Sequence, residues 1–164
     1  MVVVGERGGQ PRPAPPFTTS TLQQEASRKL NFGAKRTMAT AQQLYEGVRI
    51  DGETVGLITY MRTDSVKVAA TAQQEARAFI VERIGQPYVP AAPRIYKNKN
   101  ALAQEAHEAI RPTSIRRLPA DVKPVLTADQ ARMYELIWKR FLASQMAAAV
   151  FDVTTVEIDA VRTG

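Results

Sequence analysis

The sequence lacks cysteine altogether and has a single histidine, His107, among its 164 residues. The absence of thiols excludes disulfide bonds, thiolate metal sites and cysteine nucleophiles. No run approaches the roughly 18 consecutive apolar residues that a membrane helix needs. The first residues do not resemble a signal peptide, because their short apolar run is followed at once by charge. We therefore expect a cytoplasmic domain that makes no membrane contact.

The sequence has fewer acidic than basic residues. Lys and Arg total 22 against 16 Asp and Glu, which gives a formal charge of +6 and a pI near 9.8. This balance suits a polyanionic partner such as DNA or RNA, although many basic proteins bind neither. Four cations surround the end of the first predicted helix and are candidate DNA contacts: Arg28, Lys29, Lys35 and Arg36. A solvated helix face is an equally good interpretation of any one pair.

Residue patterns divide the chain into a proline-rich segment, a helical region and a terminal strand. Residues 1–16 end in four prolines within six residues, which predicts an extended linker. Apolar spacing and turn signals predict the remaining elements. These are helices over about 20–30, 37–46, 65–84, 101–110 and 127–148, a turn or hairpin over 47–56, and short strands at 57–60 and 151–158. The last strand has no evident partner in the chain.

Helix starts and the core are predicted from the same patterns. Ser20 or Thr21, each with Gln three residues later, would cap the first helix, Thr37 the second, and Thr127 with Gln130 the last. We expect Tyr45 on the buried stripe of the second helix and Trp138 partly buried. One shared core is predicted from Leu22, Leu30, Leu44, Phe79, Ile80, Ile137 and Phe141.

The segment around Tyr60 is the first that suggests chemistry. Arg62 follows two residues later, so on an extended chain it projects from the same face as Tyr60. A phenolic oxygen could attack phosphorus while a guanidinium holds the non-bridging oxygens. The neighbouring hydrogen-bonding residues are Thr59, Thr63, Asp64 and Ser65. On spacing alone, Tyr60 is more often a core or surface residue, and Ser65 could simply cap the next helix.

His107 lies in the second suggestive segment, which packs two acids, the histidine and Arg111 into residues 105–112. A single histidine is usually exposed or satisfied by hydrogen bonds. Glu105 and Glu108 could bind a metal, but two carboxylates without a third are weak support for Mg²⁺. The alternative is a solvated helix flanked by charge, and the residues alone predict no metal ligand.

Four blocks of sequence, taken together, closely resemble the type IA family of bacterial DNA topoisomerases. They occur in the family's order and at about its spacing: PPFTTSTLQQEA (15–26), ITYMRTDS (58–65), EAHEAIRPT (105–113) and LIWKRFLASQM (136–146). Such enzymes cut one DNA strand, hold its 5′ end as a phosphotyrosine, pass the other strand through and reseal, without ATP. The resemblance thus implies single-stranded DNA as substrate, Mg²⁺ as cofactor and a place on the nucleoid.

The resemblance also implies roles for particular residues. Tyr60 would be the nucleophile, Arg62 would place and neutralise the scissile phosphate, and His107 would support the site through the DNA backbone or the transition state. Asp64 would be an accessory group of the loop with Thr63 and Ser65, and Arg111 would serve the architecture of the site. The Mg²⁺ ligands of the family have no counterpart here.

The chain departs from the family in what it lacks. No segment resembles the toprim domain, which supplies a glutamate, a lysine and the acidic cluster for Mg²⁺, and no zinc ribbon is present. Residues 17–148 resemble the family's third domain, a CAP-like, mainly α (α+β) lobe of about five helices with a short hairpin near the tyrosine. Residues 149–164 would return to a β-rich arch domain, and residues 1–10 resemble nothing in the family. We expect an enzyme part inactive alone; the alternatives are a non-enzymatic DNA-binding module and a structural remnant.

Overall fold

The computed structural model describes residues 4–6, 12–97, 107–150 and 154–156, and every structural statement below concerns those residues. The architecture is mainly helical, as predicted. The α-helices are α1 (Thr19–Leu30), α2 (Ala34–Glu46), α3 (Ala70–Arg83), α4 (Pro119–Val122) and α5 (Ala128–Gln145). Two 3₁₀ turns, η1 (Gln86–Tyr88) and η2 (Lys123–Val125), follow α3 and α4. No helix in the described part is long and apolar enough to cross a membrane.

The N-cap of the first helix lies two residues before Ser20, the earlier of its two predicted caps. Thr18 is the N-cap of α1, and its partner in the capping box is Thr21 rather than a glutamine. Four consecutive hydroxyl residues offered several caps with equal local chemistry, and the structure uses the first of them. The helix ends, as predicted, at a residue with positive φ, since Asn31 has a φ of 58°.

The second helix starts before Thr37, so the prediction that Thr37 caps it was wrong. Gly33 is the N-cap, and the Thr37 amide already donates to the Gly33 carbonyl at 2.9 Å. The predicted hairpin follows as β2 (Val48–Ile50) and β3 (Glu53–Val55), which pair antiparallel. Asp51 and Gly52 have φ values of 50° and 88°, the left-handed geometry of a two-residue turn.

Three further boundaries differ from the prediction. The segment 57–60 forms only an isolated bridge, between Ile58 and Pro112, instead of a strand. The third helix begins at Ala70 rather than Ser65. Of the helix predicted over 101–110, residues 101–106 lie outside the described residues and 107–110 are not helical. The fifth helix has the capping box predicted for it.

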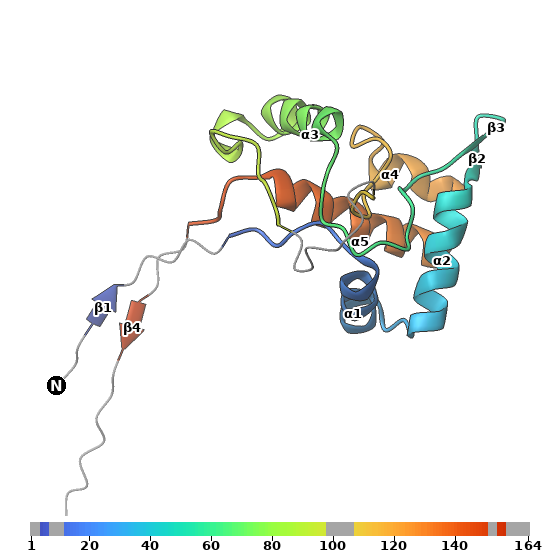
Figure 1. The fold of residues 1–164 in the computed structure, drawn as a ribbon, viewed down its shortest axis with the longest axis horizontal. Helices are drawn as coiled ribbons and strands as arrows, with labels where there is room; N and C mark the ends of the chain where they lie inside the picture. Colours follow the sequence, from blue (N-terminus) through green and yellow to red (C-terminus); the bar gives the residue numbers. More distant parts are fainter. Residues whose placement is uncertain (1–3, 7–11, 98–106, 151–153, 157–164) are drawn as a thin grey trace, which may run out of the picture.

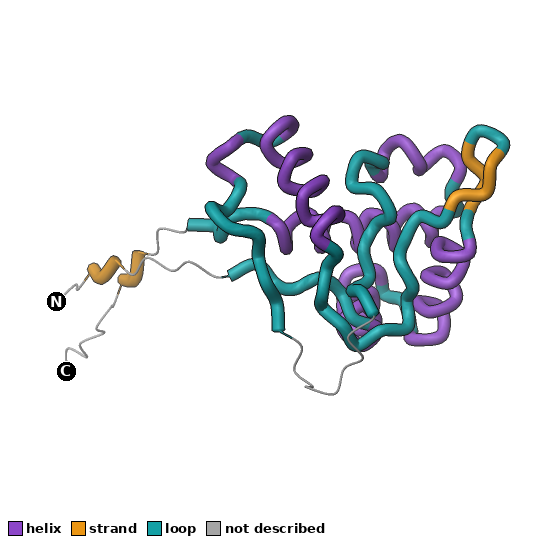
Figure 2. Tube along the Cα trace, turned by 45° about the horizontal axis from the view of Figure 1, so that its top comes forward, coloured by secondary structure: helices purple, strands orange, loops and turns teal. Residues whose placement is uncertain are grey.

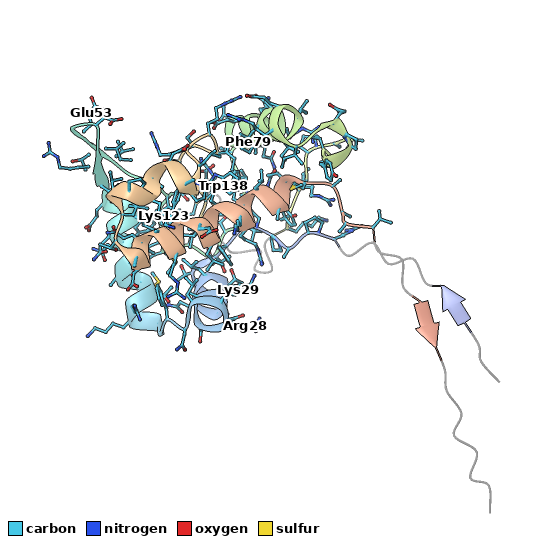
Figure 3. All side chains as sticks on the ribbon, turned by 180° about the vertical axis from the view of Figure 1, so that it is seen from behind. Arg28, Lys29, Glu53, Phe79, Lys123 and Trp138 are labelled. Atoms are coloured by element: carbon cyan, nitrogen blue, oxygen red, sulfur yellow. The ribbon has the colours of Figure 1, made fainter. Side chains whose placement is uncertain are left out.

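Two clusters of buried residues replace the single predicted core. One lies with α1 and α2 and the other under α3, which is on the opposite side of α5 from α1 (Figure 1). Leu22, Leu44 and Ile137 belong to the cluster with α1 and α2, with Leu30 packed against it, whereas Phe79, Ile80 and Phe141 belong to the cluster under α3. Trp138 packs against both and is partly buried, as predicted. Trp138 on α5 lies beneath Phe79 on α3 (Figure 3), and the two rings meet edge to face at 5.8 Å. The Trp138 indole donates to the Ile115 carbonyl.

The terminal strand has a partner within the chain, contrary to the prediction. β1 (Val4–Glu6) pairs antiparallel with β4 (Thr154–Val156), and the two lie away from the helical body, opposite the β2–β3 hairpin (Figure 1 and Figure 2). A three-residue strand containing glycine carries no period-2 signal, which is why the sequence did not reveal it. Predicted positions 151–153 and 157–158 of the terminal strand lie outside the described residues.

Side chains also tie together the segments that enter and leave the body. The Tyr96 hydroxyl lies within hydrogen-bond distance of the Pro13 and Ser144 carbonyls, at 3.0 and 2.8 Å. Burial raises the pKa of this phenol. The Arg140 guanidinium donates to the Pro15 carbonyl at 2.7 Å and lies over the Phe17 ring. These contacts fix the entry segment against the end of α5.

Candidate functional site

The Tyr60 segment alternates between exposed and buried side chains without being a strand. Tyr60 is 45% exposed, and Arg62 and Asp64 are exposed as well. The residues between them are buried: Met61, Thr63 and Ser65. Alternation on extended backbone is the pattern expected for residues that share a face at every second position. The structure thus places Tyr60, Arg62 and Asp64 on the solvent side of the segment.

The start of α1 holds this segment from one side through Thr19, which sequence reasoning missed. The Thr19 hydroxyl donates to the Met61 carbonyl at 2.8 Å and accepts from the Thr63 amide at 2.9 Å. The Thr19 amide donates to the Thr63 carbonyl at 2.9 Å. The block 15–26 and the block 58–65 are therefore in direct contact, and Thr19 restrains the backbone just beyond Tyr60.

Two of the accessory candidates fold the segment and do not face solvent. The Thr63 hydroxyl accepts from the Ser65 amide at 3.0 Å, and the Ser65 hydroxyl accepts from the Lys67 amide at 3.1 Å. Ser65 is not the cap of α3, whose N-cap is Ala69. These local hydrogen bonds hold residues 63–67 in turns, which explains why α3 starts later than predicted.

Residues 109–113 hold the segment from the other side. The Thr59 hydroxyl donates to the Ala109 carbonyl at 2.7 Å, and the Thr59 amide donates to the Arg111 carbonyl at 2.9 Å. In return, the Arg111 amide donates to the Thr59 hydroxyl at 3.0 Å. The Thr113 amide donates to the Leu57 carbonyl at 3.0 Å. The two suggestive segments of the sequence, some fifty residues apart, thereby become neighbours.

A pocket of about 370 Å³ opens where they meet. Its lining residues are Tyr45, Thr59, Tyr60, Thr63, His107 and Glu108. Tyr45 is 42% exposed, so its predicted place on a buried stripe was wrong, and its ring meets the Tyr60 ring edge to face at 5.3 Å. His107 is exposed and lies outside any helix. The pocket therefore unites the candidate nucleophile with the chain's one histidine.

Glu108 lines this pocket, and Arg111 holds the Glu108 carboxylate in place. The two Glu108 carboxylate oxygens accept from the Ala69 amide at 2.6 Å and from the Arg111 guanidinium at 2.7 Å. The Arg111 side chain is only 13% exposed. With both oxygens engaged, Glu108 is a poor metal ligand, and Glu105 lies outside the described residues. The described part of the chain holds no group of three or more acids and histidines that could bind a metal.

The four basic candidates lie elsewhere, and three of them are already paired. Arg28 and Lys29 project from the end of α1 and form ion pairs with Glu25 at 3.8 and 3.1 Å (Figure 3). Arg36 donates two hydrogen bonds of 2.7 Å to Asp129 on α5 and lies over the Phe32 ring. This pair lowers the pKa of Asp129 and raises that of Arg36. Lys35 is exposed. None of the four lines the Tyr60 pocket.

The family model for DNA topoisomerase matches residues 2–163 of this chain. The match includes residues 2–10, for which the sequence alone had suggested no relative. The chain is 56% identical over 142 residues to DNA topoisomerase 1 of Rickettsia bellii and 53% identical over 150 residues to that of Xylella fastidiosa strain Temecula1. These alignments cover 87% and 91% of this chain but 18% of each relative. The full-length topoisomerase I structure from Thermotoga maritima matches with a TM-score of 0.76 at 40% identity, over 96% of this chain and 27% of that one.

Proposed function

Because this chain belongs to the DNA topoisomerase family, we propose that it is the tyrosine-bearing part of a type IA enzyme, which breaks and rejoins one DNA strand. One observation carries the proposal. Tyr60 presents an exposed phenol on backbone that two distant segments hold, beside a pocket it shares with His107. A nucleophile needs that combination, since the reacting atom must be accessible and its geometry fixed.

In the proposed reaction the Tyr60 phenolic oxygen attacks a backbone phosphorus of single-stranded DNA. A bond forms between that oxygen and phosphorus, and the bond from phosphorus to the 3′ oxygen breaks. The phenol loses its proton, and the departing 3′ oxygen gains one. The phosphodiester is exchanged for a 5′-phosphotyrosine, so resealing is the same step in reverse and needs no ATP. Passage of the other strand between the two steps would relax negative supercoils.

The exposed neighbours have complementary roles in this proposal. Arg62 lies on the same side of the segment as Tyr60, and its planar guanidinium suits the non-bridging phosphate oxygens. His107, across the pocket, supports the DNA backbone or the transition state. Asp64 is an accessory polar group on the same exposed side. Thr63, Ser65 and Arg111 act through the architecture, since their hydrogen bonds are to the protein itself.

Other parts of the reaction require residues beyond these. Within the part of the chain that the structure describes, no donor set fits the Mg²⁺ of the family, because Glu108 is engaged and no three metal-binding side chains lie together. We propose that a toprim domain supplies the general acid and the metal site, and that residues 149–164 lead back to an arch domain. Loss of general acid catalysis commonly costs ~10²–10⁴-fold in rate, so the isolated chain should be inactive.

The test is formation of a denaturant-resistant protein–DNA adduct. The chain would be incubated with a single-stranded oligonucleotide and Mg²⁺, with and without a separately prepared toprim-containing piece of a type IA topoisomerase. We expect adduct only when both pieces are present, and none with Tyr60→Phe. Tyr88→Phe is a matched control, because Tyr88 is 50% exposed and does not line the pocket. Adduct that persists in Tyr60→Phe would remove Tyr60 from this role.

The same experiment separates the two alternatives. A non-enzymatic DNA-binding module, suggested by the charge of +6, would bind the oligonucleotide in a salt-sensitive way and give no adduct under any condition. A structural remnant would neither bind nor react.

A further inference from the structure

Tyr45 is the one aromatic side chain that touches the Tyr60 ring within the described residues. The ring centroids are 5.3 Å apart and the planes meet at 65°, within the range that aromatic pairs favour. Both rings are close to half exposed, at 42% and 45%, and both line the pocket with His107. The contact therefore lies at the proposed reaction centre and not in a hydrophobic core.

The backbone beneath the two rings is held at close range. The Leu57 amide donates to the Leu44 carbonyl at 2.8 Å, which ties the last turn of α2 to the segment that leads to Tyr60. At Gly56 the approach is so close that a Cβ atom would lie 2.8 Å from the Tyr45 carbonyl oxygen. A side chain at position 56 would force the end of α2 and the segment before Tyr60 apart. Tyr45 and Tyr60 thus emerge from two segments whose separation is fixed.

Resting on the function proposed above, we infer that Tyr45 is a positioning residue that sets the ring orientation of Tyr60. An exposed tyrosine with solvent on all sides can change its side-chain torsions freely. The Tyr45 ring removes part of that freedom, so the Tyr60 oxygen is kept in the pocket where attack can occur. The ring carries the effect, because the Tyr45 hydroxyl makes no hydrogen bond within the described part of the chain.

An exposed aromatic beside a DNA-cleaving residue could instead stack on a nucleobase. The two roles separate in kinetics. A positioning residue changes the rate of the chemical step at saturating DNA, whereas a stacking residue changes the concentration of DNA needed for saturation. The surrounding contacts favour positioning, since the Tyr45 ring is directed at Tyr60 and its backbone is fixed to the same segment.

The experiment compares Tyr45→Leu, which removes the ring, with Tyr45→Phe, which keeps it, and with Tyr88→Leu as a control on a distant exposed tyrosine. Adduct formation is followed with the toprim-containing piece over a range of oligonucleotide concentrations. We expect Tyr45→Leu to lower the maximal rate by roughly 2- to 13-fold, the range for losing an aromatic pair, with half-saturation unchanged. Tyr45→Phe and Tyr88→Leu should match the unsubstituted chain.

A second measurement needs no activity. In NMR spectra of the chain alone, the Tyr60 ring protons should carry a ring-current shift that Tyr45→Leu abolishes and Tyr45→Phe retains. An unchanged maximal rate in Tyr45→Leu, or a change confined to half-saturation, overturns the inference while the proposed function stands. Adduct that survives Tyr60→Phe overturns the proposed function instead. A Tyr60 ring shift unaffected by Tyr45→Leu removes the contact on which the inference rests.

Discussion

The Tyr60 segment and the basic cluster at the α1–α2 junction (Arg28, Lys29, Lys35 and Arg36) differ in what holds their arginines. At Tyr60 the backbone is tied down by Thr19 and by residues 109–113, and Arg62 forms no ion pair within the described residues. At the junction it is the charged side chains that are tied, with Arg36 bonded to Asp129 across two helices. An arginine that forms no ion pair, on a backbone held in place, is available to bind a ligand. An arginine that is paired with a carboxylate of the same chain stabilises the fold instead.

The largest expected difference is between Arg62→Ala and Arg36→Ala in the adduct assay. Removing a group that stabilises charge in a transition state costs on the order of 10²-fold in rate, and we expect that loss for Arg62→Ala. Arg36→Ala should react at the unsubstituted rate, because its guanidinium is engaged away from the pocket, and should instead lower the urea midpoint of unfolding. Equal effects of the two substitutions on the adduct rate would contradict the distinction between a ligand-binding Arg62 and a fold-stabilising Arg36.

Thr19→Val tests whether the backbone near Tyr60 is held as described. The change keeps side-chain shape but leaves the buried Thr63 amide without its acceptor, at a cost of roughly 1–3 kcal/mol in the free energy of unfolding. The adduct rate should fall as well. Thr54→Val on the exposed hairpin is the control, expected to change neither quantity. Urea denaturation and adduct kinetics check both, and full stability of Thr19→Val would show that this contact is dispensable.

Gly56→Ala and Gly33→Ala form a second matched pair. A Cβ at Gly56 would lie 2.8 Å from the Tyr45 carbonyl oxygen, whereas one at Gly33 meets nothing within 4 Å. Overpacking of this kind costs about 1–3 kcal/mol, and here it would push the Tyr60 segment away from α2. We expect Gly56→Ala to lower both the unfolding free energy and the adduct rate, and Gly33→Ala to leave the rate unchanged. Thermal unfolding of the two variants would show whether they differ.

The smallest expected effect concerns pH. Arg36 holds the pKa of Asp129 below its usual value, so the pair stabilises the fold above the ordinary aspartate range of about 4 and ceases to do so as pH falls through the lowered pKa. The difference in unfolding free energy between the unsubstituted chain and Asp129→Asn should therefore shrink toward acid pH. In an Arg36→Ala background this dependence on pH should be weaker, because Arg132 is then the remaining cation that lowers the pKa of Asp129. A pH-independent difference would contradict the assignment.

Local signals predicted the features that depend on a few adjacent residues. Thr127 and Gln130 predicted the start of α5, Asp51 and Gly52 the hairpin turn, and Asn31 the end of α1, because caps and tight turns are decided by local hydrogen bonds and φ. The alternation rule also predicted that Arg62 would share a face with Tyr60, and both side chains are exposed even though the segment is not a strand.

Features that depend on distant pairings could not be derived in this way. Thr19 contacts Thr63 across 44 positions, and its local pattern indicated only a helix start. Helical spacing placed Tyr45 on an apolar stripe, yet Tyr45 faces the Tyr60 segment, whose side chains on that side are polar and exposed. Arg36 and Asp129 are 93 positions apart, so the sequence could not show that this cation was already neutralised. The resemblance to a family suggested the roles that we propose for Tyr60 and His107, which spacing alone left open.

The most direct test of the central claim is to find which residue carries the DNA. Adduct formed with the toprim-containing piece and a labelled oligonucleotide would be digested with protease and nuclease and then sequenced by mass spectrometry. We predict a nucleotide joined through its 5′ phosphate to Tyr60, within the peptide that contains Arg62. A modification on any other residue, or a linkage through the 3′ end, would contradict the account.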